Sequence, residues 1–190
     1  MYPKIALASA SPRRRELLTQ IGVNFELVSP QIDESVISGE TPAAYVSRLA
    51  LAKARAGAVA IAGRLPVLGA DTTVVLEQHI LGKPESKSHF LQMLSQLSGR
   101  SHQVFTAVAV VSGEHQLQAL SCTEVWFRNI SAAELDAYWQ SGEPADKAGG
   151  YGIQGQAARF VERINGSYTG VVGLPLCETD RLLQQLQELG

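Results

Sequence analysis

The sequence contains few cysteines, few aromatic residues and no long hydrophobic run. Of its 190 residues two are cysteines, and 6% are aromatic. No stretch approaches the roughly 18 consecutive apolar residues that a membrane-spanning helix needs. The N-terminus also lacks the apolar segment and cleavage pattern of a signal peptide. We therefore expect neither a membrane protein nor a disulfide-rich secreted domain, and we predict a cytoplasmic location.

The cysteines and histidines show no metal-binding spacing. Cys122 and Cys177 are far apart and form no C-x-x-C pattern, which favours a reducing compartment and two thiols packed in the core. The histidines are scattered, and we expect them on the surface. They are His79, His89, His102 and His115.

Charge of either sign is also not in excess. The formal net charge is −2, so no overall field attracts nucleic acid or a membrane surface, and we expect neither partner. Any polyanionic ligand must be held by a local cluster of cations. The 45% hydrophobic content suits a sizeable core, and we predict a single domain over residues 1–190.

Short apolar runs interleave with helical patterns along the chain, which predicts a mixed α/β sheet covered by helices. The predicted strands are residues 5–8, 24–28, 65–68, 72–76, 80–81, 104–111, 120–127 and 158–164. The predicted helices are residues 12–20, 42–62, 85–97, 131–140 and 175–189.

The segment L-A-S-A-S-P-R-R-R-E-L-L, residues 7–18, is the most informative. Ser11 suits the N-cap of a helix, and Pro12 suits its first position. A helix N-terminus offers free N–H groups and a partial positive charge. Ser9 and three consecutive arginines beginning at Arg13 lie beside it. This pattern predicts a phosphate site, and the alternative is an ordinary capped helix with a solvated basic face.

Acidic and basic residues elsewhere could complete such a site. Asp71, flanked by apolar strand residues, is either a buried structural partner or a functional carboxylate that binds a cation or takes a proton from water. Lys53 and Lys83 would neutralise a triphosphate if they converged on it, although Lys53 could equally be solvated. Asp33 and Glu34 are either hard-cation ligands or an exposed loop pair.

The second unusual segment is the glycine-rich stretch at residues 146–155, D-K-A-G-G-Y-G-I-Q-G. It is either an ordinary flexible loop or a loop shaped for close ligand approach. The amide of Gln154 could read a base edge because it offers both a donor and an acceptor. The sequence has no G-x-G-x-x-G after a strand and no G-x-x-x-x-G-K-[ST], which excludes the Rossmann and P-loop nucleotide sites.

Together these segments resemble the Maf family of nucleoside triphosphate pyrophosphatases over nearly the whole chain. The resemblance rests on the Lys53 helix and on S-A-S-P-R-R at 9–14, G-A-D-T at 69–72, K-P at 83–84, S-G-R-S-H-Q-V-F-T-A-V at 98–108, the glycine-rich stretch, I-N-G-S-Y at 164–168 and V-G-L-P-L at 172–176. It implies an elongated mixed sheet with flanking helices and two lobes around a cleft, similar to inosine triphosphate pyrophosphatases.

The resemblance also implies a metal-dependent hydrolase that releases pyrophosphate from a nucleoside triphosphate. Asp71 falls on the catalytic acid, which acts as the general base for water, and Glu34 on an acidic position linked to metal and catalysis. Lys83 falls on a phosphate-binding position and belongs to this catalytic set. The implied cofactor is Mg²⁺ or Mn²⁺, with Co²⁺ as a third candidate, bound by Glu34 and Asp71. Relatives are commonly dimers, which implies a homodimer, although the apolar face of the last helix equally suits internal packing.

The remaining family positions concern the substrate. Arg13 and Lys53 fall on phosphate-binding positions, and Ser9 lines the same turn. Arg13, Thr72 and Gln154 fall on positions associated with substrate choice. Thr72 and the Y-G-I-Q-G loop look like the branch that acts on dTTP and UTP, a house-cleaning activity that extends to modified pyrimidine triphosphates. The alternatives are the branch that prefers 7-methyl-GTP, and a nucleotide-binding regulator of cell division, suggested by the septum-formation origin of the family name.

Overall fold

The computed structural model describes residues 2–189, which build one seven-stranded sheet in the order β2-β1-β3-β5-β6-β7, with β4 paired to β3. β2, β1 and β3 are parallel neighbours, and the other pairs are antiparallel. The strands are β1 (Ile5–Ala8), β2 (Phe25–Val28), β3 (Val67–Leu76), β4 (His79–Leu81), β5 (Ser101–Ser112), β6 (His115–Phe127) and β7 (Val161–Asn165).

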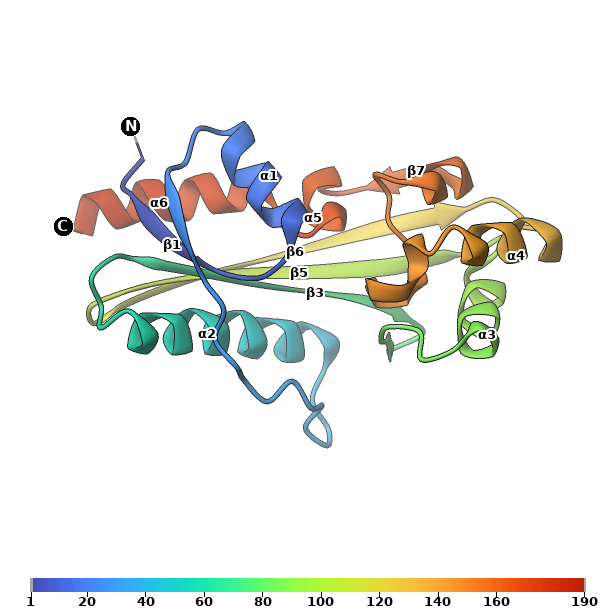
Figure 1. Ribbon diagram of the computed structural model, residues 1–190, viewed down its shortest axis with the longest axis horizontal. Helices are drawn as coiled ribbons and strands as arrows, with labels where there is room; N and C mark the ends of the chain where they lie inside the picture. The colour runs from blue at the N-terminus through green and yellow to red at the C-terminus, as the bar shows by residue number, and fades with distance from the viewer. Residues whose placement is uncertain (1, 190) are drawn as a thin grey trace.

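Helices flank this sheet, and the long strands run along the longest axis of an elongated molecule (Figure 1). α2 covers one face, whereas α1, α5 and α6 lie on the other, and α3 and α4 gather at one end. The helices are α1 (Pro12–Gln20), α2 (Pro42–Ala60), α3 (Lys87–Leu97), α4 (Ala132–Gln140), α5 (Tyr168–Val172) and α6 (Leu176–Leu189), with 3-10 turns η1 (Glu143–Asp146), η2 (Ala148–Gly150) and η3 (Gln156–Phe160).

The local helix signals are mostly confirmed. Thr41 caps α2 by accepting a hydrogen bond from the Ala44 N–H, and Ser131 forms a capping box with Glu134 at α4. Ser11 occupies the N-cap of α1, but its side chain makes no capping bond. Its N–H instead donates to Ser9 Oγ at 3.2 Å, so the turn before α1 is closed by Ser9.

Several predicted strand boundaries are wrong. β6 begins at His115 and not at residue 120, and β5 begins at Ser101 and not at residue 104. Residues 65–68 and 72–76 were expected as separate strands, but β3 is continuous because an unbroken ladder with β5 holds residues 67–75 extended. Residues 158–160 form the end of η3 rather than a strand, and the short helix α5 has too few residues to show a periodic pattern.

For three residues the observed burial is the opposite of the predicted burial. Cys122 and Cys177 are both exposed, so the prediction that they pack in the core is wrong. Cys122 alternates along β6 with buried Ser121 and Thr123, which puts its side chain on the uncovered face. His102, expected on the surface, is buried and hydrogen-bonded through Nε2 to the Tyr151 hydroxyl at 2.7 Å.

Within residues 2–189, no helix is both long and apolar enough to span a bilayer.

The cleft between the two lobes originates at a gap along one edge of β3. β1 pairs with β3 only as far as Gly69, and β4 begins to pair at Val74. Residues 70–73 therefore have a neighbouring strand, β5, on one side only. This arrangement confirms the predicted mixed α/β fold with two lobes and leaves Asp71 and Thr72 at the unpaired edge.

Close packing of α2 on β3 depends on Gly69. A Cβ atom at this position would lie 2.4 Å from the Ala50 carbonyl oxygen and 2.6 Å from the Ala54 nitrogen, both in the backbone of α2. The absence of a side chain lets the helix approach the strand, and this approach brings Lys53 over Asp71.

We expect Gly69→Ala to destabilise the protein by about 3 kcal/mol, because the methyl group has to push a whole helix backbone away from the sheet. Gly82→Ala is the matched control, since a Cβ there meets no atom within 4 Å. Urea unfolding of both variants measures the difference, and equal stabilities would contradict this account of the α2 contact.

Candidate active site

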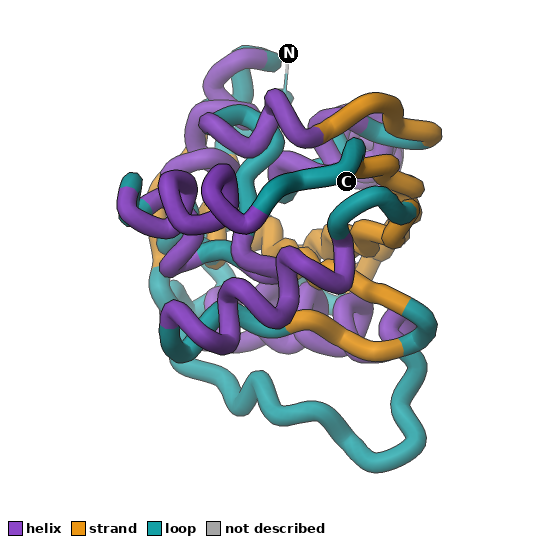
Figure 2. The backbone as a smooth tube through the Cα atoms, turned by 90° about the vertical axis from the view of Figure 1, so that its right-hand side faces the viewer, coloured by secondary structure: helices purple, strands orange, loops and turns teal. Residues whose placement is uncertain are grey.

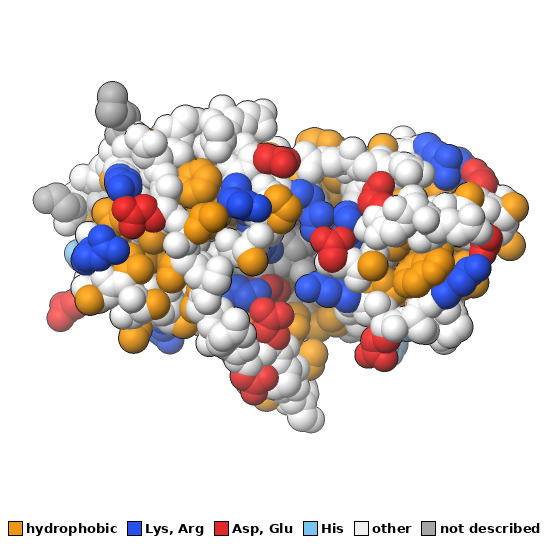
Figure 3. Space-filling view, in the orientation of Figure 1, with side chains coloured by type: hydrophobic (Ala, Val, Ile, Leu, Met, Phe, Trp, Pro, Cys, Tyr) orange, Lys and Arg blue, Asp and Glu red, His pale blue; other side chains and the backbone are white. Residues whose placement is uncertain are grey.

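A cleft of about 1310 Å³ opens at the gap in β3. One wall comes from β1, the start of α1, the loop before α2 and α2 itself, and the other from residues 80–85 and 143–155. Charged side chains of both signs gather around this hollow (Figure 3). It is lined by all eight residues to which the family resemblance assigns a place in the site, namely Ser9, Arg13, Glu34, Lys53, Asp71, Thr72, Lys83 and Gln154.

Asp71 and Glu34 share the ammonium group of Lys53. The Lys53 Nζ lies 2.7 Å from Asp71 Oδ1 and 2.8 Å from Glu34 Oε1. Burial raises the pKa of Asp71, which is 7% exposed, although Lys53 and Arg14 act in the opposite direction. The two carboxylates therefore converge on one cationic centre. The raised pKa makes the Asp71 carboxylate a stronger base than an ordinary aspartate.

A long loop protrudes from the molecule between β2 and α2 (Figure 2). Glu34 of this loop lines the cleft. Arg48 of α2 donates to both carboxylate oxygens of Glu40 at 2.7 Å and to the Ser35 carbonyl at 2.9 Å. The Tyr45 hydroxyl donates to the Glu34 carbonyl at 3.0 Å. Asp33 is not part of the set, because its Oδ1 accepts from the Ser35 N–H at 2.9 Å and its side chain does not line the cleft.

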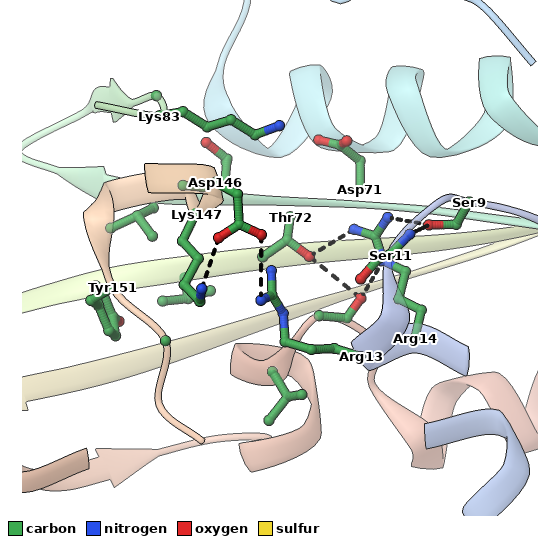
Figure 4. A pocket seen from close by; sticks show the side chains of 18 of the residues that line it. Ser9, Ser11, Arg13, Arg14, Asp71, Thr72, Lys83, Asp146, Lys147 and Tyr151 are labelled. Carbon is green, nitrogen blue, oxygen red and sulfur yellow. Dashed lines mark hydrogen bonds and ion pairs between the residues drawn. The ribbon is translucent and has the colours of Figure 1, made fainter. Parts of the chain in front are cut away.

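Two consecutive arginines at the start of α1 have different environments (Figure 4). Arg13 reaches across the cleft, with Nη1 3.9 Å from Asp146 Oδ2. Arg14 donates to Ser9 Oγ at 3.1 Å, to Thr72 Oγ1 at 3.2 Å and to the Gly173 carbonyl at 2.8 Å. Sequence reasoning did not single out Arg14, because the R-R-R run does not show which side chain faces inward.

The opposite wall carries further cations. Lys83, just after β4, points its ammonium group into the cleft (Figure 4), and no described residue forms an ion pair with it. Lys147 is held by Asp146 Oδ1 at 2.8 Å and by the Glu143 carbonyl at 2.5 Å. Gln154 is exposed at the margin of the cleft, between η2 and η3.

Residues 4–186 match the family described as Maf-like protein. This chain belongs to the Maf family. It is 53% identical over 182 residues to a dTTP/UTP pyrophosphatase of Vibrio vulnificus, a match that covers 96% of this chain and 98% of the relative. It is 55% identical to a dTTP/UTP pyrophosphatase of Saccharophagus degradans, over 95% of this chain and 88% of the relative.

The fold of this Maf protein is also found in a solved structure. A HAM1 protein from Coxiella burnetii superposes with a TM-score of 0.55 at 18% identity, covering 98% of this chain and 99% of that one. The likeness concerns the fold, and it agrees with the elongated mixed sheet predicted from the sequence.

Proposed function

We propose that this Maf protein hydrolyses dTTP and UTP, together with modified pyrimidine triphosphates, to the nucleoside monophosphate and pyrophosphate. The names of its relatives support this substrate choice. The observation that carries the chemistry is the buried Asp71 carboxylate, bound by Lys53 and facing the cations of Arg13 and Lys83 across one cleft.

In this proposal Asp71 is the general base. Its Oδ1 is held by Lys53 at 2.7 Å, which orients the carboxylate, and Oδ2 accepts a proton from water. The water oxygen bonds to the α-phosphorus as the bond to the bridging oxygen breaks and pyrophosphate leaves. Because burial raises the pKa of Asp71, its carboxylate is a stronger base than an exposed one would be.

The donor set suits a divalent cation. Asp71 and Glu34 already converge on one positive charge, and oxygen ligands suit Mg²⁺ or Mn²⁺, and also Co²⁺. Within residues 2–189 no group of three or more His, Cys, Asp or Glu side chains surrounds a single point, so phosphate oxygens and water would complete the coordination. When bound, the ion neutralises charge on the departing pyrophosphate.

The cationic side chains position the phosphates. Arg13 at the N-terminus of α1 and Lys83 on the opposite wall approach the cleft from its two lobes, so one triphosphate can bridge them. Ser9 adds a hydroxyl at the same turn. Thr72 and Gln154 are then available to contact the nucleotide base.

A cytoplasmic location and a homodimer stay predictions. The apolar face of α6 packs internally through Leu182, Leu183 and Leu186.

The test is pyrophosphate release from a panel of triphosphates with Mg²⁺ or Mn²⁺. We expect turnover of dTTP and UTP to exceed that of CTP, GTP and 7-methyl-GTP by about 100-fold or more in kcat/KM, because a site built for an N–H donor leaves polar groups unpaired with other bases. Preference for 7-methyl-GTP would assign the chain to the other Maf branch. Binding without turnover of any triphosphate would favour the regulator of cell division.

A further inference from the structure

Gln154 lies in a tight turn whose own residues give it little rigidity. The Gly155 N–H donates to the Gly152 carbonyl at 3.0 Å, which closes the turn. Of the two central residues, Ile153 is buried in the hydrophobic core, whereas Gln154 is exposed at the margin of the cleft. Because a glycine stands at either end, the position of Gln154 depends on the contacts that hold these ends.

Tyr138 of α4 and Glu143 of η1 hold both ends of the turn. The buried Tyr138 hydroxyl accepts from the Gly152 N–H at 3.2 Å and donates to Glu143 Oε1 at 2.8 Å. Glu143 Oε2 accepts from the Gln156 N–H at 2.9 Å. Burial, together with the bond to Glu143, raises the pKa of Tyr138, so its hydroxyl keeps the proton that it donates. One chain of hydrogen bonds therefore spans the turn from residue 152 to residue 156.

Gly155 leaves room for the Glu143 carboxylate. A Cβ atom at position 155 would lie 2.2 Å from Glu143 Oε1 and 2.4 Å from Oε2. The φ angle of Gly155 is −101°, a value that alanine also adopts, so the carboxylate and not the backbone conformation excludes a side chain here. Glu143 thus packs against the turn as well as binding one of its ends.

We propose that Tyr138 and Glu143 are positioning residues that hold the Gln154 amide against the nucleotide base, and thereby set the preference for thymine and uracil over cytosine. This inference rests on the proposed hydrolysis of dTTP and UTP. An amide offers a donor and an acceptor, so it distinguishes bases only when its orientation is fixed. A turn that is already ordered also avoids the entropy cost of ordering it on binding. Tyr138 does not line the cleft, so its effect on a nucleotide has to pass through the turn.

The experiment measures kcat and KM for dTTP and dCTP in the full chain with three variants. Glu143→Gln leaves one oxygen for two donors, Tyr138→Phe removes the hydroxyl, and Gly155→Ala displaces the carboxylate. Each should raise KM for dTTP about tenfold, the effect of one hydrogen bond, with kcat within about twofold. The dTTP/dCTP ratio of kcat/KM should fall several-fold. A wild-type KM and ratio in any of the three would overturn the proposal.

Glu134→Ala is the control for a loss of stability. Glu134 caps α4 and lies 2.6 Å from Arg128 Nη2, so its removal weakens the helix that carries Tyr138 without touching the turn. We expect a lower Tm with the KM and the dTTP/dCTP ratio of the wild type. A ratio that falls as far as in Tyr138→Phe would reduce the effect to stability and overturn the positioning role.

Two further measurements test the route. In a Gln154→Ala background, Tyr138→Phe should change the ratio no further, and an additional loss of the same size would overturn the inference. Glu143→Gln should need the same Mg²⁺ concentration for half-maximal activity as the wild type, because both Glu143 oxygens already accept hydrogen bonds from the protein. A higher requirement would make Glu143 a cation ligand and overturn its positioning role.

The proposed function fails separately from this inference. Failure of the wild type to turn over dTTP would overturn the proposed function alone. The dissociation constants of dTTP and dCTP, measured by titration calorimetry on the same variants, then test Tyr138 and Glu143. A loss of the wild-type preference for dTTP in both variants would support the positioning role, and an unchanged preference would overturn it.

Discussion

Asp71→Asn is expected to lower kcat for dTTP about 1000-fold while nucleotide binding survives within a few-fold. The amide has the same shape as the carboxylate but does not take a proton from water. The proposed phosphate contacts of Arg13 and Lys83 come from other parts of the cleft and are kept. Pyrophosphate release gives kcat, and titration calorimetry with dTTP in the presence of Mg²⁺ gives the affinity.

Asp33→Asn is the matched control for this change. Asp33 is exposed, accepts a hydrogen bond from the Ser35 N–H and does not line the cleft, so we expect its kcat to stay near that of the wild type. Near-normal turnover by Asp71→Asn would contradict the general-base role. Loss of binding together with turnover would show that Asp71 acts through the bound nucleotide–metal complex instead.

Lys53→Met is expected to lower activity at pH 7 about 100-fold and to move the acidic limb of the pH–activity profile to higher pH. Burial raises the pKa of Asp71, and the Lys53 ammonium at 2.7 Å opposes that rise. Without the lysine the pKa rises further. Since Asp71 must be ionised to accept a proton, activity is lost as pH falls through this pKa, and the loss begins at a higher pH in the variant.

Arg55→Met provides the comparison from the same helix. Arg55 lies two positions from Lys53, faces solvent and donates to Gln116 Oε1 at 2.6 Å, away from the cleft. Its kcat/KM profile against pH should match that of the wild type. A Lys53→Met profile that is unshifted, or shifted to lower pH, would show that Lys53 does not control the ionisation of Asp71.

Features that depend on neighbours within a few residues were predictable from the sequence. The Thr41 cap and the Ser131–Glu134 capping box each involve atoms three residues apart, and both are present. β3 was divided wrongly because Gly69 and Asp71 weaken the local strand pattern. The backbone conformation there is set by the ladder to β5, in which Gly69 pairs with Ala109 and Asp71 with Ala107, far along the chain.

The contents of the cleft were predictable because the family resemblance marks them segment by segment. The relationships among its side chains were not. Arg13 and Arg14 are adjacent and chemically identical, and only the tertiary structure shows that Arg14 is the one that contacts Ser9 and Thr72. Thr106 of β5 likewise contacts Thr72, with the two Oγ1 atoms 3.0 Å apart, because the β3–β5 register places them opposite each other. A shift by one residue would turn the Thr106 side chain to the other face of the sheet.

The sequence by itself determined the family, the α/β class, the caps of α2 and α4 and the cationic turn at the start of α1, because motif chemistry and capping are local. Tertiary structure alone decided that β1 and β4 leave residues 70–73 unpaired, and that one lysine bridges Asp71 and Glu34. These features join segments distant in the sequence. They exist because the packing of α2 on Gly69 and the pairing of β3 with β5 are favourable together, and no short stretch of sequence specifies either.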